Sequence, residues 1–173
     1  APTATLDPSG KPVYSNGVEF NLPNGLGTDA AGSLIPEALG EPNTPDPGHP
    51  AYLQFKLQGY PVTAPDEYRI AQVQVFSANT NVFAMNGDVT KLNAILAAPN
   101  LQLTQESVPQ NYLLMASNLK TLNSSDGSVR GVRMVAIRGN GLLPVTNDGQ
   151  LAYQFHGLTS DGKYYVLINL PIN

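Results

Sequence analysis

The chain contains no cysteine and no tryptophan, and only 13% of its 173 residues are charged. Without cysteine, disulfides, thiolate metal sites and cysteine nucleophiles are all excluded. The charged fraction is about half of that in average soluble domains, so amides and hydroxyls supply much of the surface polarity. A core is still expected, because 42% of the residues are hydrophobic and a chain of this length buries about 70% of its unfolded surface without staples.

Positive charge and long apolar runs are scarce as well. Nine basic residues against thirteen acids give a net charge of −4, and no basic stripe is present, so no nucleic-acid partner is expected. Arg130, Arg133 and Arg138 form the one basic cluster, which is more typical of solvated strand charge than of an anion site. Apolar runs such as 113–116 and 164–168 fall far short of the roughly 20 residues of a membrane-spanning helix.

Recognised catalytic motifs are also missing. The chain has no Gly-x-Ser-x-Gly elbow and no phosphate-cradling glycine loop. Its two histidines are His49, in a proline-rich segment that favours exposure, and His156, at no ligand spacing from other residues. Strand parity groups His156 with Gln154 and opposite Phe155, which predicts that its ring faces outward. The sequence therefore predicts no catalytic residue, no metal site and no cofactor.

Acids, turn residues and tyrosines raise three further possibilities. A carboxylate-dependent hydrolase needs two acids about 5–10 Å apart, and Glu19 with Glu106 could form such a pair across a groove. That enzyme predicts a cleft with two convergent acids and at least one raised pKa. A calcium loop is not expected, because 124–128 and 147–149 carry one carboxylate each and are typical of hairpin turns. Eight tyrosines could build a sugar-binding surface, although packing is their commoner use.

Strand alternation is the main pattern in the first half of the chain. Residues 18–22, 51–59 and 69–77 alternate apolar and polar side chains with the period of two typical of half-buried strands. Residues 34–39 predict a short helical turn, and 41–50, with four prolines, predict a surface loop.

One principal helix is predicted over 88–98. Asn86 or Asp88 supplies an N-cap oxygen, and Pro99 prevents the helix from continuing. Its apolar stripe consists of Val89, Leu92, Ile95 and Leu96.

The C-terminal part reads as an antiparallel meander. The expected strands are 114–122, 129–137, 150–157 and 163–170, joined at turns that contain Asp-Gly. The last strand has apolar residues on both faces, which predicts cover on both sides. The prediction is an α+β fold: mainly an antiparallel sheet of about six or seven strands, one principal helix and a C-terminal β-meander. Residues 1–12 are expected to be a flexible leader, and 13–173 a single domain.

The final hairpin carries a family resemblance. Residues 155–166 contain Gly-Leu-Thr-Ser-Asp-Gly-Lys-Tyr-Tyr, and together with 131–133 and 55–61 they resemble a family of uncharacterised exported bacterial proteins with signal-peptide or lipoprotein leaders. Ser160 stands where that family commonly has an acid. The order of elements is also similar to the PsbP-like α+β sandwich, whose members dock onto larger assemblies. The resemblance implies no catalytic residues.

The first residues, Ala-Pro-Thr-Ala-Thr, are similar to the small-residue segment that follows a removed signal peptide, which predicts an extracytoplasmic location. The sequence therefore favours a non-catalytic domain that is a structural or partner-binding component of a cell-envelope assembly, with a protein partner or copies of itself. The alternatives are a small carboxylate-dependent hydrolase and a carbohydrate-active or carbohydrate-binding module. A module for a small ligand would instead show an apolar pocket with convergent polar groups.

Overall fold

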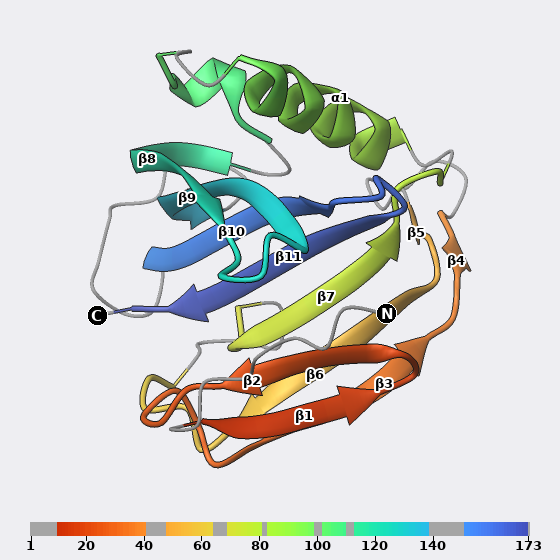
Figure 1. Cartoon of the computed structure of the whole chain (residues 1–173), viewed down its shortest axis with the longest axis vertical. Coiled ribbons are helices and arrows are strands. Elements are labelled where there is room, and N and C mark those ends of the chain that lie inside the picture. Colours follow the sequence, from red (N-terminus) through yellow and green to blue (C-terminus); the bar gives the residue numbers. More distant parts are fainter. Residues whose placement is uncertain are drawn as a thin grey trace.

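A seven-stranded antiparallel sheet is the main element of the computed structural model (Figure 1), which describes residues 10–40, 48–63, 69–80, 83–98, 102–109, 113–138 and 151–172. Its order is β3-β6-β7-β11-β10-β9-β8. The strands are β3 Asp29–Ile35, β6 Tyr52–Gln58, β7 Gln72–Ser77, β8 Leu113–Asn123, β9 Val129–Arg138, β10 Leu151–Thr159 and β11 Tyr164–Pro171. The predicted α+β fold, mainly sheet and ending in a meander, is confirmed.

The remaining elements are small. Strands β1 Lys11–Ser15 and β2 Val18–Leu22 form a separate hairpin, and β4 Ala38–Leu39 pairs with β5 Gly48–His49. The α-helix α1 covers Phe83–Ala97, and a 3-10 helix, η1, covers Gln105–Ser107.

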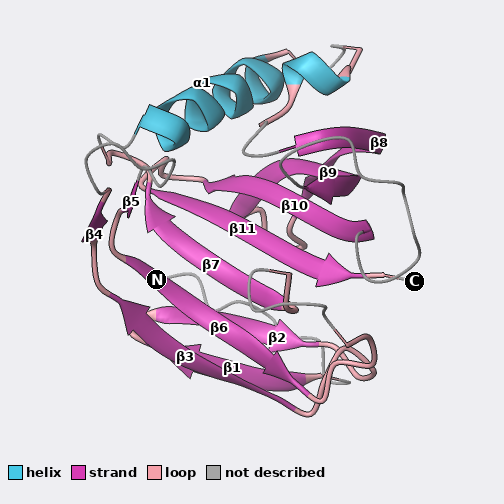
Figure 2. Ribbon diagram, turned by 180° about the vertical axis from the view of Figure 1, so that it is seen from behind, coloured by secondary structure: helices cyan, strands magenta, loops and turns pink. Residues whose placement is uncertain are grey.

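The sheet is covered at opposite ends on opposite faces (Figures 1 and 2). Helix α1 packs on one face over β9 and β10, and its Leu92 and Ile95 belong to the same buried core as Met134 and Tyr165. We call this side the helix face. The hairpin β1–β2 lies on the other side, over β3, β6 and β7, where it forms a second core of Val13, Leu22, Ala30, Leu53 and Phe55.

Most predicted strands are confirmed. The segments expected at 18–22, 51–59 and 69–77 contain β2, β6 and the shorter β7, and the meander contains β8 to β11. Strand β11 lies between β7 and β10 in the middle of the sheet. The turn expected at 147–149 lies outside the described residues.

Three boundaries differ from expectation. Strand β1 begins at Lys11, inside the segment expected to be leader. Helix α1 begins at Phe83 rather than near Asp88, which is buried within the helix. Residues 34–39 contain the end of β3 and the short strand β4 instead of a helical turn, because β3 pairs with β6 as far as Ile35 and β4 pairs with β5. Tertiary pairing outweighs local helix propensity in such short segments.

The segment 41–50, which was predicted to be a surface loop, contains the short strand β5 near its end. Gly48 has a φ of +73°, and a Cβ atom there would lie 2.3 Å from the carbonyl oxygen of Ala38. Glycine is therefore required for β5 to approach β4.

Candidate functional site

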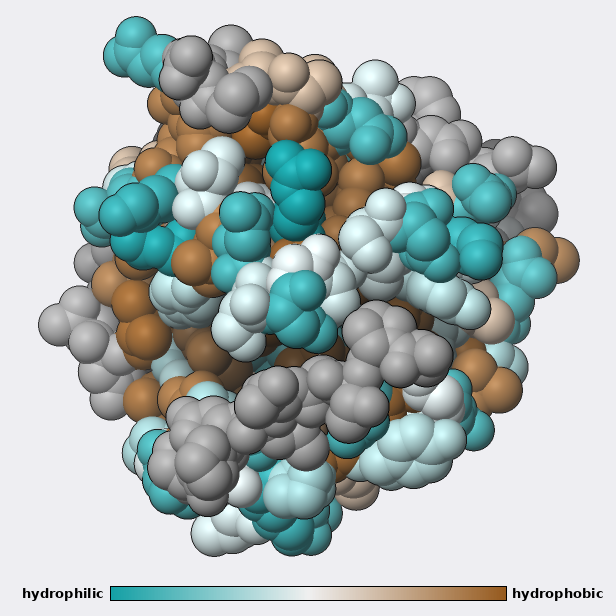
Figure 3. All heavy atoms as spheres, viewed as in Figure 1, coloured by the Kyte–Doolittle hydropathy of each residue, from teal (hydrophilic) through white to brown (hydrophobic). Residues whose placement is uncertain are grey.

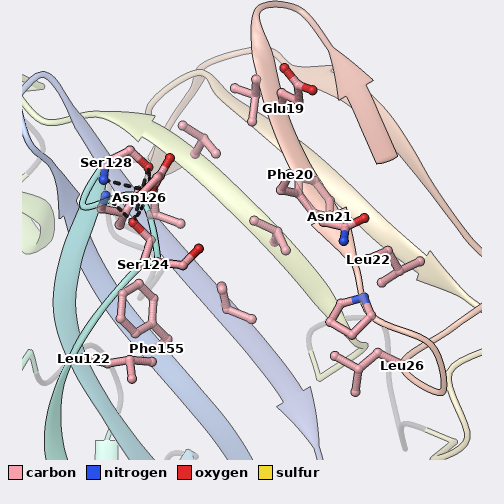
Figure 4. Close-up of a pocket in the computed structure, with 18 of the residues that line it drawn as sticks. Glu19, Phe20, Asn21, Leu22, Leu26, Leu122, Ser124, Asp126, Ser128 and Phe155 are labelled. Carbon is pink, nitrogen blue, oxygen red and sulfur yellow. Dashed lines mark hydrogen bonds between the residues drawn. The ribbon is translucent and has the colours of Figure 1, made fainter. Parts of the chain in front are cut away.

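An apolar groove of about 540 Å³ lies on the side of the sheet opposite α1 (Figure 4). Its lining residues come from β2 and the segment after it, from β6, β7, β10 and β11, and from the β8–β9 turn. They are Val18, Glu19, Phe20, Asn21, Leu22, Pro23, Leu26, Leu57, Val73, Val75, Leu122, Asn123, Ser124, Ser125, Asp126, Ser128, Val129, Tyr153, Phe155, Val166, Ile168 and Leu170. The space-filling view in Figure 3 shows brown hydrophobic atoms among hydrophilic ones. We call the groove-lining side of the sheet the groove face.

The floor of the groove is made by the middle strands of the sheet. Val75 from β7, Val166 and Ile168 from β11, and Tyr153 from β10 are each only half-buried. In the register of the sheet, Val166 pairs with Val75 on one side and with Gly157 on the other. The floor is therefore a continuous apolar surface built by strand alternation.

Among the described residues, the hairpin β1–β2 covers only part of the groove face. Phe20 of β2 packs edge-on against Phe55 of β6, with ring centroids 5.0 Å apart. This contact fixes β2 over β6 and β7. The groove is the strip of this face between β2 and the β8–β9 turn.

The helix face of the same strands carries a buried polar row. The Nε2 atom of Gln154 donates to Oδ1 of Asn169 at 3.0 Å, and the Nδ2 atom of Asn169 donates to the carbonyl oxygen of Ile70 at 3.1 Å. The Nε2 atom of Gln54 donates to Oε1 of Gln72 at 2.6 Å. These four side chains are at most 8% exposed.

The predicted outward orientation of His156 is wrong. The side chain is 3% exposed, and its Nδ1 atom lies 2.5 Å from the hydroxyl oxygen of Tyr165. Its Nε2 atom lies 3.3 Å from Oε1 of Gln154. His156 does lie on the same face of β10 as Gln154, as the strand alternation predicted. That face, however, is the one on which α1 packs. The alternation of a single strand does not tell which face is covered.

His49 is half-buried rather than exposed. Its ring packs against Tyr52 at 5.4 Å between centroids, and Nδ1 lies 3.0 Å from the carbonyl oxygen of Pro50. Among the described residues, no group of three or more His, Asp or Glu side chains is placed to hold a metal ion.

Two acids lie on opposite walls of the groove, Glu19 on β2 and Asp126 in the β8–β9 turn (Figure 4). The hydroxyl of Ser124 donates to Oδ1 of Asp126 at 2.6 Å, and the backbone N–H and hydroxyl of Ser128 donate to the same atom at 2.9 and 2.7 Å. These bonds, led by the Ser124 hydroxyl, lower the pKa of Asp126 to about 2. Its carboxylate therefore stays ionised at neutral pH.

The pair Glu19 and Glu106, which the hydrolase alternative singled out, is not brought together at the groove. Glu19 lines it, whereas Glu106 lies on η1 and is not among the lining residues. Hydrogen bonds from its own backbone N–H and from Thr104 lower the pKa of Glu106. The pKa values of Asp29 and Asp161 are lowered as well, by bonds from Lys11 and Thr159 respectively.

The segment 124–128 forms the expected hairpin turn. Its chemistry is repeated in the β10–β11 turn, where the Thr159 hydroxyl and the Lys163 N–H donate to Oδ1 of Asp161 at 2.7 and 3.1 Å. In both turns the following glycine, Gly127 or Gly162, has a positive φ. The hydrogen bonds that one carboxylate oxygen accepts within the turn explain why an aspartate stands at position 126. A calcium ion is not needed for this explanation.

The arginines do not form one site. Arg130 donates from Nη2 to the carbonyl oxygen of Leu96, in the last turn of α1, at 3.3 Å. Arg133 pairs in register with Phe155, a groove-lining residue, so it lies on the groove face of β9, opposite to Arg130. Arg130 thus donates a hydrogen bond to a backbone carbonyl group at the C-terminal end of α1.

The groove itself was missed at the sequence level. The signal for the groove in the sequence was the presence of apolar residues on both faces of β11. This pattern predicted that other elements cover both faces of the strand. The two faces differ, since Tyr165 is 1% exposed while Val166 is only half-buried.

Within the described part of the chain, no helix is both long enough and apolar enough to cross a membrane. No family model, no curated protein and no solved structure was found to match the chain.

Proposed function

We propose that this chain is a non-catalytic binding domain whose binding site is the groove. One observation carries the proposal: the central strands bury their amides on the helix face and leave valine and isoleucine half-exposed on the groove face. Folding alone favours the reverse arrangement, because apolar burial stabilises by roughly 25 cal/mol per Å². An occupant that covers the groove would recover this stabilisation on binding.

The dimensions of the groove support the same proposal. Ligand sites are commonly clefts of about 300–1,000 Å³ with apolar walls and a few polar groups, and this groove of about 540 Å³ has hydroxyl and amide groups beside its apolar floor. A role as a component of an extracytoplasmic cell-envelope assembly is part of the proposal, and the low charged fraction of 13% supports a protein partner.

The hydrolase alternative has less support. Its general acid would need a raised pKa in the cleft, whereas the pKa of Asp126 is lowered to about 2. The carbohydrate alternative would favour exposed, coplanar rings, and the groove is lined mainly by aliphatic side chains.

The proposal is tested with Nile red, a neutral dye whose fluorescence rises in apolar surroundings. Leu122 and Met115 form a matched pair, because both lie on β8 and are 43% and 52% exposed, but only Leu122 lines the groove. We expect saturable binding of the dye that Leu122→Lys weakens about tenfold and Met115→Lys leaves unchanged, since a cation in an apolar site is costly.

Circular dichroism and thermal unfolding of both variants serve as controls for folding. Absence of saturable binding, or equal effects of the two substitutions, would show that the groove is not an apolar binding site.

A further inference from the structure

Strand β3 forms one edge of the seven-stranded sheet. It pairs with β6 from Asp29 to Ile35 in continuous antiparallel register, and no described strand pairs with its other side. Figure 2 shows β3 at the outer margin of the sheet, beyond β6. None of its residues lines the groove, so this edge is a second surface, separate from the proposed binding site.

The hydrogen bonds of β6 show which backbone groups of β3 are free. The N–H of Leu57 donates to the carbonyl oxygen of Ala71 at 3.0 Å, on the β7 side of the strand. The carbonyl oxygen of Gln58 accepts from the N–H of Thr28 at 2.8 Å, on the β3 side. Backbone groups of successive residues point to opposite sides of a strand. In β6, the groups that point toward β3 therefore belong to Gln58 and to every second residue before it.

Three residues of β3 direct their backbone groups to the free edge. Every second residue from Asp29 to Ile35 pairs with the positions of β6 that point toward β3, so the residues between them point away: Ala30, Gly32 and Leu34. The N–H of Ala30 is already used, because it donates to Oδ1 of Asp29 at 2.8 Å. The N–H and C=O groups of Gly32 and Leu34 have no hydrogen-bond partner among the described residues.

The edge of β3 lacks the features that protect exposed strands. Residues 30–35 include no charged side chain and no proline, and the pairing with β6 has no register shift. At the opposite edge of the sheet, the pairing of β8 with β9 has two register shifts, and Asn118 between them has a φ of +53°. Such irregularities discourage a further strand from pairing, so β3 is the edge of this sheet that is suited to it.

Exposed apolar side chains gather beside this edge. Leu34 on β3 is 68% exposed, Tyr14 on β1 is 73% exposed and Leu39 on β4 is 85% exposed. Strand β1 contacts β3, and β4 begins three residues after the end of β3. Grouped apolar side chains at a surface indicate contact with another protein.

We propose that two copies of this chain associate through β3, with the two edges pairing antiparallel about a twofold axis at Ser33. In this register Gly32 faces Leu34 of the second copy, so the free N–H and C=O groups of both residues bond to each other. Ala30, whose N–H is occupied, faces Pro36, which has no N–H. The order of free and occupied groups along the edge thus complements itself, which favours a second copy over a strand of another protein.

The charges near the edge are compatible with this pairing. Extended past the end of β3, the register sets Asp29 opposite Glu37 of the second copy, where two bare carboxylates would repel each other. Asp29 is already paired, because its Oδ1 atom lies 2.9 Å from Nζ of Lys11 on β1. This ion pair leaves little net charge opposite Glu37.

Sedimentation equilibrium of the whole chain tests the association. A single strand pair is a small interface, so we expect a reversible dimer with a dissociation constant no tighter than about 1 µM. Leu34→Lys should weaken dimerisation at least about tenfold, because a cation on an edge opposes pairing. Met115→Lys places the same charge on β8, where the side chain is 52% exposed, and should have no effect. Thermal unfolding of both variants is the control for folding.

Disulfide cross-linking tests the register. The chain contains no cysteine, so an introduced thiol has only its counterpart in another copy to pair with. Ser33 and Ala31 are a matched pair, because both are exposed and lie on the same side of β3. In the proposed dimer the two Ser33 residues face each other with Cα atoms about 4.5 Å apart, which suits a disulfide, whereas Ala31 faces Ile35. With dissolved oxygen as oxidant, Ser33→Cys should form a covalent dimer at least about tenfold faster than Ala31→Cys.

Three results would contradict the proposal. A chain that stays monomeric up to about 1 mM does not pair through this edge, and a dimer that Leu34→Lys leaves intact uses another surface. Equal rates of cross-linking for the two cysteine variants would show that β3 does not pair about Ser33. The binding role of the groove is tested separately by Nile red, since none of these substitutions lies among its lining residues.

Discussion

The two faces of the central strands differ in a direction that folding alone does not explain. On the helix face, Gln154 and Asn169 are 1% and 3% exposed. On the groove face, Val166 and Ile168 of the same sheet are half-buried. A sheet with one solvated face normally places its apolar residues inside and its polar residues outside.

The difference shows how the chain keeps an apolar surface open. The helix face buries amides at modest cost, because the side chains of the row hydrogen-bond to one another and to the backbone. The groove face leaves Val166 and Ile168 half-buried. On the proposed function, the core under α1 contributes to stability, and the strip of the groove face that the hairpin β1–β2 leaves half-buried contributes to binding.

The largest loss of stability is expected from a substitution in the core on the helix face. Leu92 is fully buried in the core under α1, so Leu92→Ala should lower the free energy of unfolding by about 2–5 kcal/mol. Leu170→Ala is the matched change on the groove face, where the side chain is half-buried, and should cost less than half as much. Urea denaturation measures both, and equal losses would contradict the assignment of the two faces.

A smaller effect is expected from the polar row. Gln154→Leu removes the donor to Oδ1 of Asn169 and should cost about 1–3 kcal/mol, because a buried acceptor loses its bond. Gln58→Leu changes an exposed amide on β6 and should be nearly neutral. A neutral Gln154→Leu variant in urea denaturation would mean that the row does not contribute to stability.

The smallest effect concerns the turn on the groove wall. Ionised Asp126 has a folded pKa of about 2 against an ordinary 3.8. Its contribution to stability is therefore complete above about pH 4 and is lost as the pH falls through about 2. For this exposed group, Asp126→Asn should cost less than about 1 kcal/mol.

The pH dependence is measured by following the carboxyl carbon of Asp126 by NMR. A titration midpoint near 3.8, rather than near 2, would show that the hydroxyl and amide bonds of the turn do not persist in solution.

The sequence was sufficient for much of the fold and for little of the site. Alternation and turn residues located most strands because these signals are local. The ends of elements depended on pairing: Leu34 and Ile35 extend β3 through its register with β6, and Ala38–Leu39 pair with β5. His156 and the groove could not be predicted, because the same alternation is compatible with either face being covered, and the positions of α1 and β2 are set by tertiary packing.

One measurement tests the central claim most directly: stability and Nile red binding of Val166→Thr and Val132→Thr, the same exchange on the two faces. Val132 is fully buried in the core under α1, and Val166 lies in the groove. We predict that Val132→Thr costs about 1–3 kcal/mol by burying a hydroxyl and leaves dye binding intact. Val166→Thr should cost less than about 1 kcal/mol and should weaken dye binding. Equal losses of stability with unchanged dye binding would contradict the division between a stabilising face and a binding face.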